Sequence, residues 1–276
     1  MHYTSLHTHS TFSDGKSTME EQVLSAIEKG LTTIGFSDHS YTDFDLSYCM
    51  KQEQIPDYLR SIRDLSQRYG DQIEILTGLE LDGYGNLPDN TPGNLTSNPY
   101  DYIIGSVHYV HTSDGLYHPV DSNKEGMVQL TETYFGGDYN AMAKQYLEDS
   151  IQCAYRNRPD IVGHFDLATK YNLVDEDDPD YQKVLLTCAA AVLEACPVFE
   201  INTGAIARGY RQAPYPHPNA IRYINEHGGK FILTSDCHDA RYLDCHYAES
   251  VALAKSCGVR SLVRLTTHGW VEEGID

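Results

Sequence analysis

Short apolar segments alternate with amphipathic segments along the whole chain. Residues 32–37 and 102–107 are apolar runs bounded by turn residues, a pattern typical of buried strands. Between such runs, apolar side chains recur at helical spacing, for example at Val23, Ile27 and Leu31. This alternation predicts βαβ units, which build a parallel sheet covered by helices.

The expected elements follow one another from end to end. The first helix begins at a capping-box sequence, residues 17–20, and ends at Gly30, and the second ends at Gly70. Further helices are expected at about residues 138–156, 180–195, 219–227 and 246–257. The expected strands lie at about residues 3–9, 32–37, 73–81, 102–107, 161–163, 198–202 and 230–235.

Three segments depart from this alternation. Residues 82–99 are rich in Gly, Pro and Asn and predict a loop. Residues 109–137 form a longer insertion without clear periodicity, and such a stretch is more often a functional lid than a linker. The apolar residues 262–265 predict either an eighth strand or a cover for the barrel. No linker is evident, so residues 1–276 are expected to form a single domain.

Polar residues recur at one position in this pattern, the carboxyl end of each strand. In a (β/α) barrel these ends form one ring around the active-site face, whereas an open sheet would spread them along a line. The sequence therefore predicts an α/β fold of the TIM-like barrel type, with about seven or eight units. The residues at the strand ends are His7, His9, His39, Glu80, His108, His164, Asp236 and His238.

The amino-acid composition indicates a globular protein and argues against some partners. Apolar residues make up 41% of the chain, which is enough for a sizeable core. The chain has no membrane-spanning run and no secretory signal at its start, so a cytoplasmic location is expected. A formal charge of −20 argues against nucleic acid and anionic membranes as partners. The sequence does not specify an oligomeric state.

The cysteine pattern indicates a reducing compartment. The chain has 7 cysteines, and no two are spaced as Cys-x-x-Cys. Cys188, Cys196 and Cys257 lie in apolar surroundings typical of buried free thiols. Cys237 lies between Asp236 and His238, and we expect its side chain to face away from them, although it could also be a ligand.

Imidazoles and carboxylates at the strand ends are the ligands that divalent transition metals prefer. Any one of these histidines could simply be a hydrogen-bonded strand-end residue, but six at the same topological position point to a metal site. Adding Asp14, which lies in the turn after the first strand, gives more ligands than one ion can hold. His111 is intermediate, and the remaining histidines are expected to be solvated: His2, His118, His217, His227, His246 and His268.

The ordered motifs resemble those of the PHP family of metal phosphoesterases, over essentially the whole chain. They are His7-Thr8-His9, Ser37-Asp38-His39, Gly78-Leu79-Glu80, Gly105-Ser106-Val107-His108, Gly163-His164-Phe165-Asp166 and Ser235-Asp236-Cys237-His238. The fourth motif and Glu200-Ile201-Asn202-Thr203 also resemble the histidinol-phosphate phosphatase branch. The resemblance implies a distorted (β/α)7 barrel with two to three divalent ions, such as Zn, Mn or Fe.

The resemblance also implies how the ligands are shared. The first ion would be held by His7, His9, Glu80 and Asp236. The second would share Glu80 with His108 and His164. The third would be held by Asp14, His39 and His238, and because some relatives have histidine in place of Asp14, the occupancy of this third site is left open.

Metal-assisted hydrolysis of a phosphate monoester is the expected chemistry, with Glu80 and Asp236 at the catalytic centre. Asp236 is a candidate proton donor to the leaving group, as is a metal-bound water, and His111 is a weaker option. Arg208, in the loop after the sixth strand, is the first candidate for binding the phosphate, with Lys170 and Arg211 as second choices. For Arg211 a solvated surface role is favoured, and Asn202 would either bind substrate or cap its own loop.

Three functions are compatible with this sequence. The favoured one is hydrolysis of L-histidinol phosphate in histidine biosynthesis. The second is a PHP phosphoesterase acting on nucleoside phosphates or short oligonucleotides. The third is a barrel that binds metal without catalysing a reaction. A Ser-His-Asp hydrolase is disfavoured because the chain contains no Gly-x-Ser-x-Gly elbow.

Overall fold

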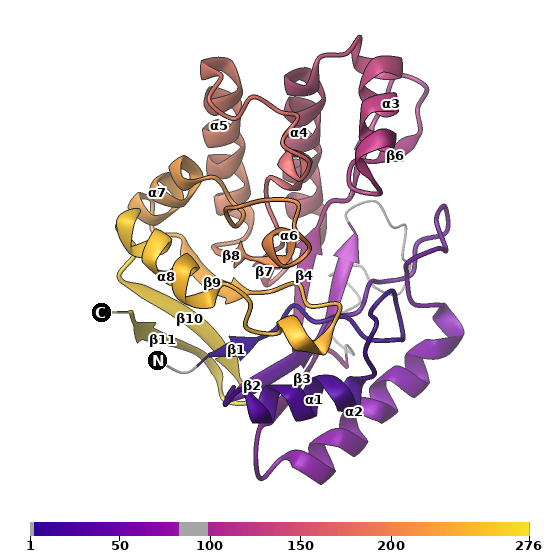
Figure 1. Ribbon diagram of the computed structural model, residues 1–276, viewed down its shortest axis with the longest axis vertical. Helices are drawn as coiled ribbons and strands as arrows, with labels where there is room; N and C mark the ends of the chain where they lie inside the picture. The colour runs from indigo at the N-terminus through magenta and orange to yellow at the C-terminus, as the bar shows by residue number, and fades with distance from the viewer. Residues whose placement is uncertain (1–2, 83–98, 276) are drawn as a thin grey trace.

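The computed structural model describes residues 3–82 and 99–275. Seven parallel strands form one sheet in chain order, and this sheet curves into a nearly closed barrel (Figure 1). The predicted (β/α)7 barrel is therefore confirmed. The barrel strands are β1 (Thr4–Ser5), β2 (Thr33–Phe36), β3 (Glu74–Asp82), β4 (Tyr102–Ser106), β7 (Ile161–Val162), β8 (Val198–Asn202) and β9 (Lys230–Thr234).

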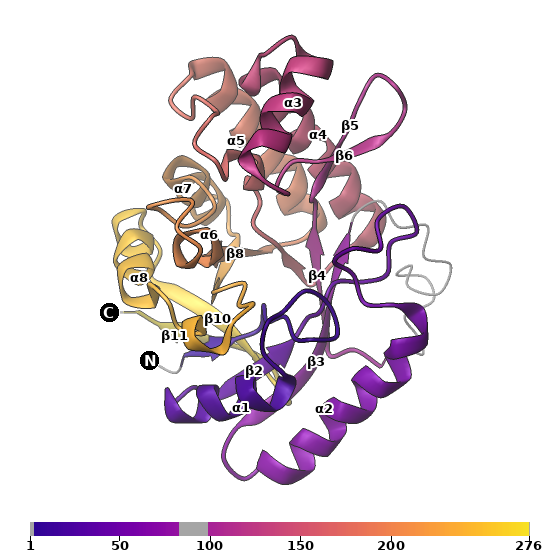
Figure 2. The same ribbon diagram turned by 45° about the vertical axis from the view of Figure 1, so that its right-hand side comes forward.

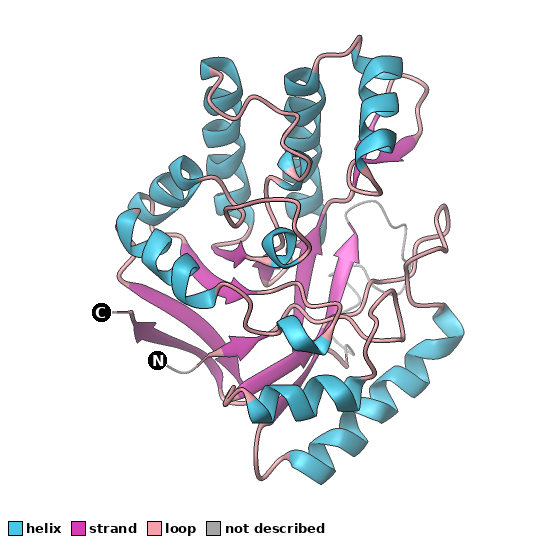
Figure 3. Ribbon diagram, viewed as in Figure 1, coloured by secondary structure: helices cyan, strands magenta, loops and turns pink. Residues whose placement is uncertain are grey.

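Helices cover the outside of the barrel, and strands and helices alternate along the chain (Figure 3). The main helices are α1 (Met19–Glu28), α2 (Ile55–Tyr69), α4 (Tyr139–Asn157), α5 (Pro179–Ala195), α7 (Pro218–Glu226) and α8 (Tyr247–Ser256). Shorter helices are α6 (Gly204–Ala207) and the 3₁₀ turns Gln52–Gln54, Leu167–Thr169 and Ala240–Tyr242. No helix in the described part of the chain is long and apolar enough to cross a membrane.

The sequence places most elements to within one or two residues. At the first helix the capping box is shifted by one residue from the prediction, because Thr18 caps α1 and pairs with Glu21. The predicted loop 82–99 lies almost entirely outside the described residues, as does His2.

The first strand is shorter than expected, because its regular pairing stops after Ser5. The chain stays extended beyond that point and closes the barrel through isolated hydrogen bonds to the segment after β9. The His9 amide donates to the Cys237 carbonyl at 2.8 Å, and the Cys237 amide donates to the His7 carbonyl at 2.9 Å. The two ends of the chain that carry the first and last metal motifs are thereby joined.

The apolar residues 262–265 cover the barrel and do not extend its sheet. They lie in β10 (Ser261–Thr266), which pairs antiparallel with β11 (Gly269–Gly274) in a separate two-stranded sheet. Val263 and Leu265 pack with Leu6, Leu76 and Tyr102 in one buried cluster. This cluster fills the interior of the barrel with apolar side chains.

The insertion 109–137 contains the hairpin β5 (Tyr109–His111) and β6 (Tyr117–Pro119), followed by α3 (Lys124–Phe135). Figure 2 shows the hairpin and α3 together at one end of the molecule. Both pack on α4, and Val110 and Met127 are buried in the large core that α4 shares with α5. The expectation that this segment acts as a lid stays a prediction.

Tyr102 explains why two strand positions are glycine. Its ring lies against Gly35 of β2 and Gly78 of β3, and a Cβ atom added at Gly78 would come within 2.2 Å of it. Tyr102 is buried, so its ring has no free space into which it could move.

We expect Gly78→Ala to lower the free energy of unfolding by about 1–3 kcal/mol, because overpacking displaces a ring that the barrel holds in place. Chemical denaturation measures this change. Gly274→Ala is the control, since a Cβ atom there would meet no atom closer than 4.0 Å. Equal stability of the two variants would contradict the proposed packing.

Candidate metal centre

The predicted ligands converge at the carboxyl end of the barrel around the side chain of Glu80. One of its oxygens, Oε2, lies 2.9 Å from His39 Nδ1 and 3.2 Å from His7 Nε2. The other oxygen lies 3.0 Å from His164 Nε2 and 3.5 Å from His108 Nε2. Glu80 therefore reaches imidazoles from four different segments, as a bridging ligand must.

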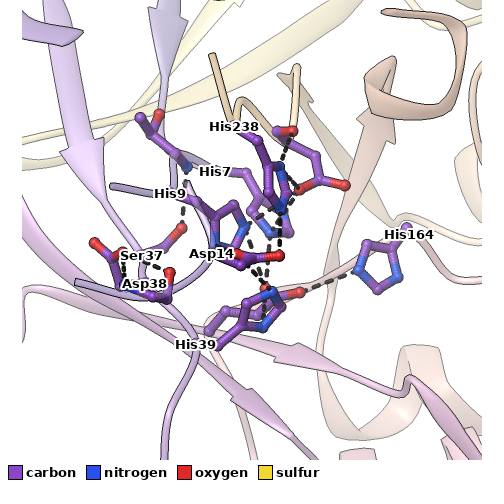
Figure 4. A network of polar contacts seen from close by, with 12 residues as sticks. His7, His9, Asp14, Ser37, Asp38, His39, His164 and His238 are labelled. Carbon is purple, nitrogen blue, oxygen red and sulfur yellow. Dashed lines mark hydrogen bonds and ion pairs between the residues drawn. The ribbon is translucent and has the colours of Figure 1, made fainter. Parts of the chain in front are cut away.

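Asp14 is the centre of a second group. Figure 4 shows His9, His39 and His238 arranged around its carboxylate, with His164 reaching in from the opposite side of the cluster. His238 Nε2 lies 3.2 Å from an Asp14 oxygen, and His39 Nε2 lies 3.7 Å from one. Asp14 comes from a turn and its side chain is 35% exposed, so this group lies at the mouth of the site.

All nine predicted ligands belong to groups that could hold a metal ion. In each group the candidate ligand atoms lie within 4.8 Å of one another. His9 belongs to two groups, that of Asp14 and that of Asp236, whereas the sequence-based assignment gave it to the first ion alone. The four groups are His9 with Asp14, His39 and His238; His7 with His9 and Asp236; His7 with Glu80 and His164; and His39 with Glu80 and His108.

The donor atoms fit metal ions better than they fit one another. Among the described residues, several buried atoms at the centre of the cluster have no hydrogen-bond partner, including His7 Nε2, both ring nitrogens of His9, and Glu80 Oε2. Buried polar groups in proteins are nearly always paired, so unpaired atoms facing a common centre indicate a missing ligand. Imidazole nitrogens and carboxylate oxygens form a donor set suited to Zn, Mn or Fe.

The buried carboxylates of the cluster are kept ionised by positive charge around them. Burial alone would raise the pKa of Glu80, but the neighbouring imidazoles, His7 first, hold it well below its usual range. Burial and the adjacent His238 lower the pKa of His9 to about 3, so this imidazole is neutral and its lone pair is available. The cluster thus combines ionised carboxylates with a neutral ligand nitrogen.

Buried carboxylates behind the ligands orient them. Glu200 Oε1 lies 2.6 Å from His7 Nδ1, and Glu200 Oε2 accepts hydrogen bonds from the His164 amide and the Asn202 side chain, each at 2.9 Å. A proton on His7 Nδ1 that is held by Glu200 leaves Nε2 free to bind an ion. Asp82 lies 3.1 Å from His108 Nδ1 in the same arrangement.

Asp38 organises the loop that carries Asp14. Its carboxylate accepts hydrogen bonds from the backbone and hydroxyl groups of Ser10 and Ser13, the shortest at 2.6 Å. The role of Asp38 in the Ser37-Asp38-His39 motif is therefore structural. The sequence analysis named Asp38 and Glu200 only as parts of motifs and did not predict their hydrogen bonds, because their partners are distant in the chain.

Arg208 is a cation in direct contact with two of the predicted ligands. Its guanidinium donates to Asp236 Oδ2 at 2.8 Å, and its Nη1 lies 3.0 Å from His238 Nδ1. Gly204 makes room for this pair, since a Cβ atom there would lie 2.8 Å from the Asp236 side chain. Asp236 itself has a left-handed backbone with φ of 46°, and such rarely populated conformations cluster at functional sites.

A cavity of about 300 Å³ opens from the cluster. Arg208 and Lys170 both line it, but the Lys170 ammonium is paired with Asp121, 3.1 Å away. Asn202 is fully buried and accepts a hydrogen bond from the Gly204 amide, so it caps its own loop. His111 lines a separate cavity with Tyr117 and is not brought to the cluster.

The expectation of a solvated Arg211 is wrong. Arg211 is buried, and it pairs with Glu176 at 2.9 Å and donates to Thr169. Cys237 faces away from the cluster, as expected, with its sulfur near Gln22 and the Asp239 carbonyl. The remaining described histidines join no candidate metal group: His118, His217, His227, His246 and His268.

Residues 5–204 match the PHP domain family. The chain belongs to the PHP family. A "Probable histidinol-phosphatase" of Deinococcus radiodurans is 28% identical over 250 residues, which is 89% of each chain. The histidinol-phosphatase of Bacillus subtilis is 26% identical, covering 85% of this chain and 92% of its own.

Solved structures share the fold of this chain. The histidinol phosphate phosphatase of Lactococcus lactis, solved with Zn, L-histidinol and phosphate, aligns with a TM-score of 0.70 at 20% identity. The alignment covers 97% of this chain and 98% of that one. Family membership and the buried ligand groups together assign the chain to the metal-dependent phosphoesterases of the PHP family.

We expect Glu200→Gln to weaken metal binding about 10–100-fold, because the amide cannot hold a proton on His7 Nδ1 as firmly as a carboxylate does. Isothermal titration calorimetry of metal-free protein with Zn²⁺ or Mn²⁺ measures the affinity. Glu194→Gln on the exposed face of α5 is the control. Unchanged affinity in Glu200→Gln would show that Glu200 does not act on the ligands.

Proposed function

We propose that this chain is a histidinol-phosphatase that hydrolyses L-histidinol phosphate to L-histidinol and phosphate in histidine biosynthesis, in the cytoplasm. The observation that carries the proposal is the ring of nine metal-ligand candidates that opens onto a cavity of about 300 Å³. That volume is at the lower end of the range for small-molecule sites and suits a small ester. Relatives named as histidinol-phosphatases cover most of the chain.

The proposed cofactors are two to three divalent ions, Zn, Mn or Fe. Such ions, when bound, lower the pKa of a coordinated water and screen the charge of the phosphate dianion. The deepest ligands are those around Glu80, and the outermost are those around Asp14. The proposed ligand sets are His7, His9, Glu80 and Asp236 for the first ion; Glu80, His108 and His164 for the second; and Asp14, His39 and His238 for the third.

The chain itself contributes a phosphate ligand and a defined geometry. Asp236 holds the Arg208 guanidinium at the cavity wall, where its remaining N–H groups can donate to the phosphoryl oxygens. Glu80 and Asp236 lie at the reacting centre. Burial would raise the pKa of Asp236, but Arg208 and His7 hold it well below its usual range, so Asp236 is ionised and the proposed proton donor to the leaving alcohol is a water. Lys170 stays a weaker candidate for the phosphate because Asp121 already accepts from its ammonium.

Purified protein loaded with Mn²⁺, Zn²⁺ or Fe²⁺ is expected to release phosphate from histidinol phosphate with a kcat/KM at least about 100-fold above that for nucleoside monophosphates, since the cavity favours a small ester. A phosphate-release assay across these esters measures the ratio, with chelated protein as the control. Equal turnover of all esters would contradict the substrate but leave the phosphoesterase chemistry intact. Bound metal without turnover of any ester would indicate a barrel that only binds metal.

Arg208→Ala is expected to lower kcat/KM for histidinol phosphate about 100–1000-fold, because it removes a preorganised cation facing the phosphoryl group. Arg208→Lys should recover part of the loss, since the charge remains but the planar fork does not. Arg222→Ala, at an exposed position of α7, is the matched control. Turnover of the Arg208→Ala variant equal to that of the unaltered enzyme would rule out a role for Arg208 in catalysis.

A further inference from the structure

The wall of the active-site cavity combines two sets of residues with different chemistry. One set is the metal-ligand candidates and Arg208, and it suits a phosphate dianion. The other set is Asp45 and Tyr48, from the loop between β2 and α2, and Tyr109 of β5. No sequence motif marks this second set, because its residues belong to segments that lack regular periodicity.

Asp45 brings an uncompensated negative charge to the cavity wall. Its Oδ1 accepts hydrogen bonds from the Ser47 amide and hydroxyl, and its Oδ2 accepts one from the Tyr109 hydroxyl at 2.8 Å. These bonds hold the pKa of Asp45 below its usual range, although partial burial opposes them. All of its partners are neutral, and no ion pair among residues 3–82 and 99–275 includes Asp45.

The other acids of the cavity are already occupied. Asp121 is paired with Lys170 at 3.1 Å, and Asp14 and Asp236 belong to the metal-ligand groups. Residues 83–98 contain no Lys or Arg, so that segment has no long-chain cation to offer Asp45. Among the described residues that line the cavity, Asp45 is therefore the carboxylate whose charge remains for a ligand.

Aromatic rings stand beside this carboxylate. The Tyr48 ring packs edge-on against His39 at 4.8 Å between centroids, and its hydroxyl donates to Asp82 at 2.6 Å, so the ring is fixed. The Tyr109 ring lies 6.2 Å from that of Tyr48 and 4.9 Å from that of Phe44. Aromatic faces next to a carboxylate attract a cation by both the ring quadrupole and the charge.

We propose that Asp45, with the rings of Tyr48 and Tyr109, binds the positively charged group of the leaving alcohol and thereby selects phosphate esters of cationic amino alcohols. The proposal rests on the phosphatase function proposed above and adds its specificity determinant. The cavity then matches a substrate with a dianion at one end and a cation at the other. An ester without the cation would leave Asp45 desolvated and unpaired in the complex, which lowers its affinity.

Asp45→Asn tests the proposal because the amide is isosteric with the carboxylate. Its oxygen can still accept from Ser47, and its NH₂ group can donate to the Tyr109 oxygen, so only the charge is lost. The substrates are histidinol phosphate, phosphoethanolamine, which carries an ammonium but no imidazole, and p-nitrophenyl phosphate, which carries no cation. Asp43→Asn, an exposed acid on the same loop, is the matched control.

We expect Asp45→Asn to raise KM for histidinol phosphate about 10-fold or more, with kcat little changed and turnover of p-nitrophenyl phosphate unaffected. A parallel loss with phosphoethanolamine identifies the ammonium as the bound cation, and its absence identifies the imidazole. An equal loss with p-nitrophenyl phosphate would mean that Asp45 only supports its loop, and would overturn the proposal. An unchanged KM for every ester would overturn it as well.

The two proposals fail in different ways. Preference of the unaltered enzyme for phosphoethanolamine over p-nitrophenyl phosphate, lost in Asp45→Asn, supports the cation site even if histidinol phosphate is a poor substrate. Efficient turnover of histidinol phosphate that Asp45→Asn leaves unchanged supports the phosphatase function and contradicts the cation site.

Discussion

The burial of one carboxylate, Glu80, among imidazoles is the constraint on which the site depends. Glu80 is 1% exposed, and its two oxygens lie between 2.9 and 3.5 Å from the nearest nitrogens of five histidines. A charged group removed from water is costly unless cations or hydrogen bonds compensate it. The imidazoles alone leave several buried atoms unpaired in the described structure, so divalent ions are the natural complement.

The barrel separates this polar cluster from its apolar interior. Tyr102, Leu6 and the cover strand β10 fill the interior with hydrocarbon, while the ligands occupy the carboxyl ends of the strands. Between these layers, Glu200 bonds to both His7 and the His164 backbone, which follow β1 and β7, two strands that are not adjacent in the sheet. Ligands on strand ends, held by buried carboxylates, need little reorganisation when an ion or a substrate arrives.

The cavity derives its polarity from two sources. The barrel supplies the ligand ring and Arg208. The loop after β2 and the hairpin β5–β6 supply another part of the wall, with Asp45 and Tyr109 joined by a hydrogen bond of 2.8 Å. The proposed catalytic residues therefore lie on the rigid barrel, whereas the residues proposed to select the substrate lie on the connecting segments, as is common in barrel enzymes.

Much of this architecture can be read along the chain. The strand and helix periods predict the barrel. The recurrence of His and acidic residues at strand ends predicts eight of the nine members of the cluster, and the ninth, Asp14, lies in the turn after the first strand. Such predictions succeed because each depends on a local pattern that parallel strands convert directly into spatial proximity.

Other features follow from contacts between distant segments. Glu200 meets His7 across 193 positions, and Tyr109 meets Asp45 across 64. Arg211 looks like a surface residue in sequence, yet it is buried because Glu176 folds onto it. A local sequence pattern does not indicate which charge or hydroxyl from a distant segment will face a given side chain. The ion pair and burial of Arg211, and the absence of a cationic partner for Asp45 among the described residues, are therefore decided by the tertiary structure.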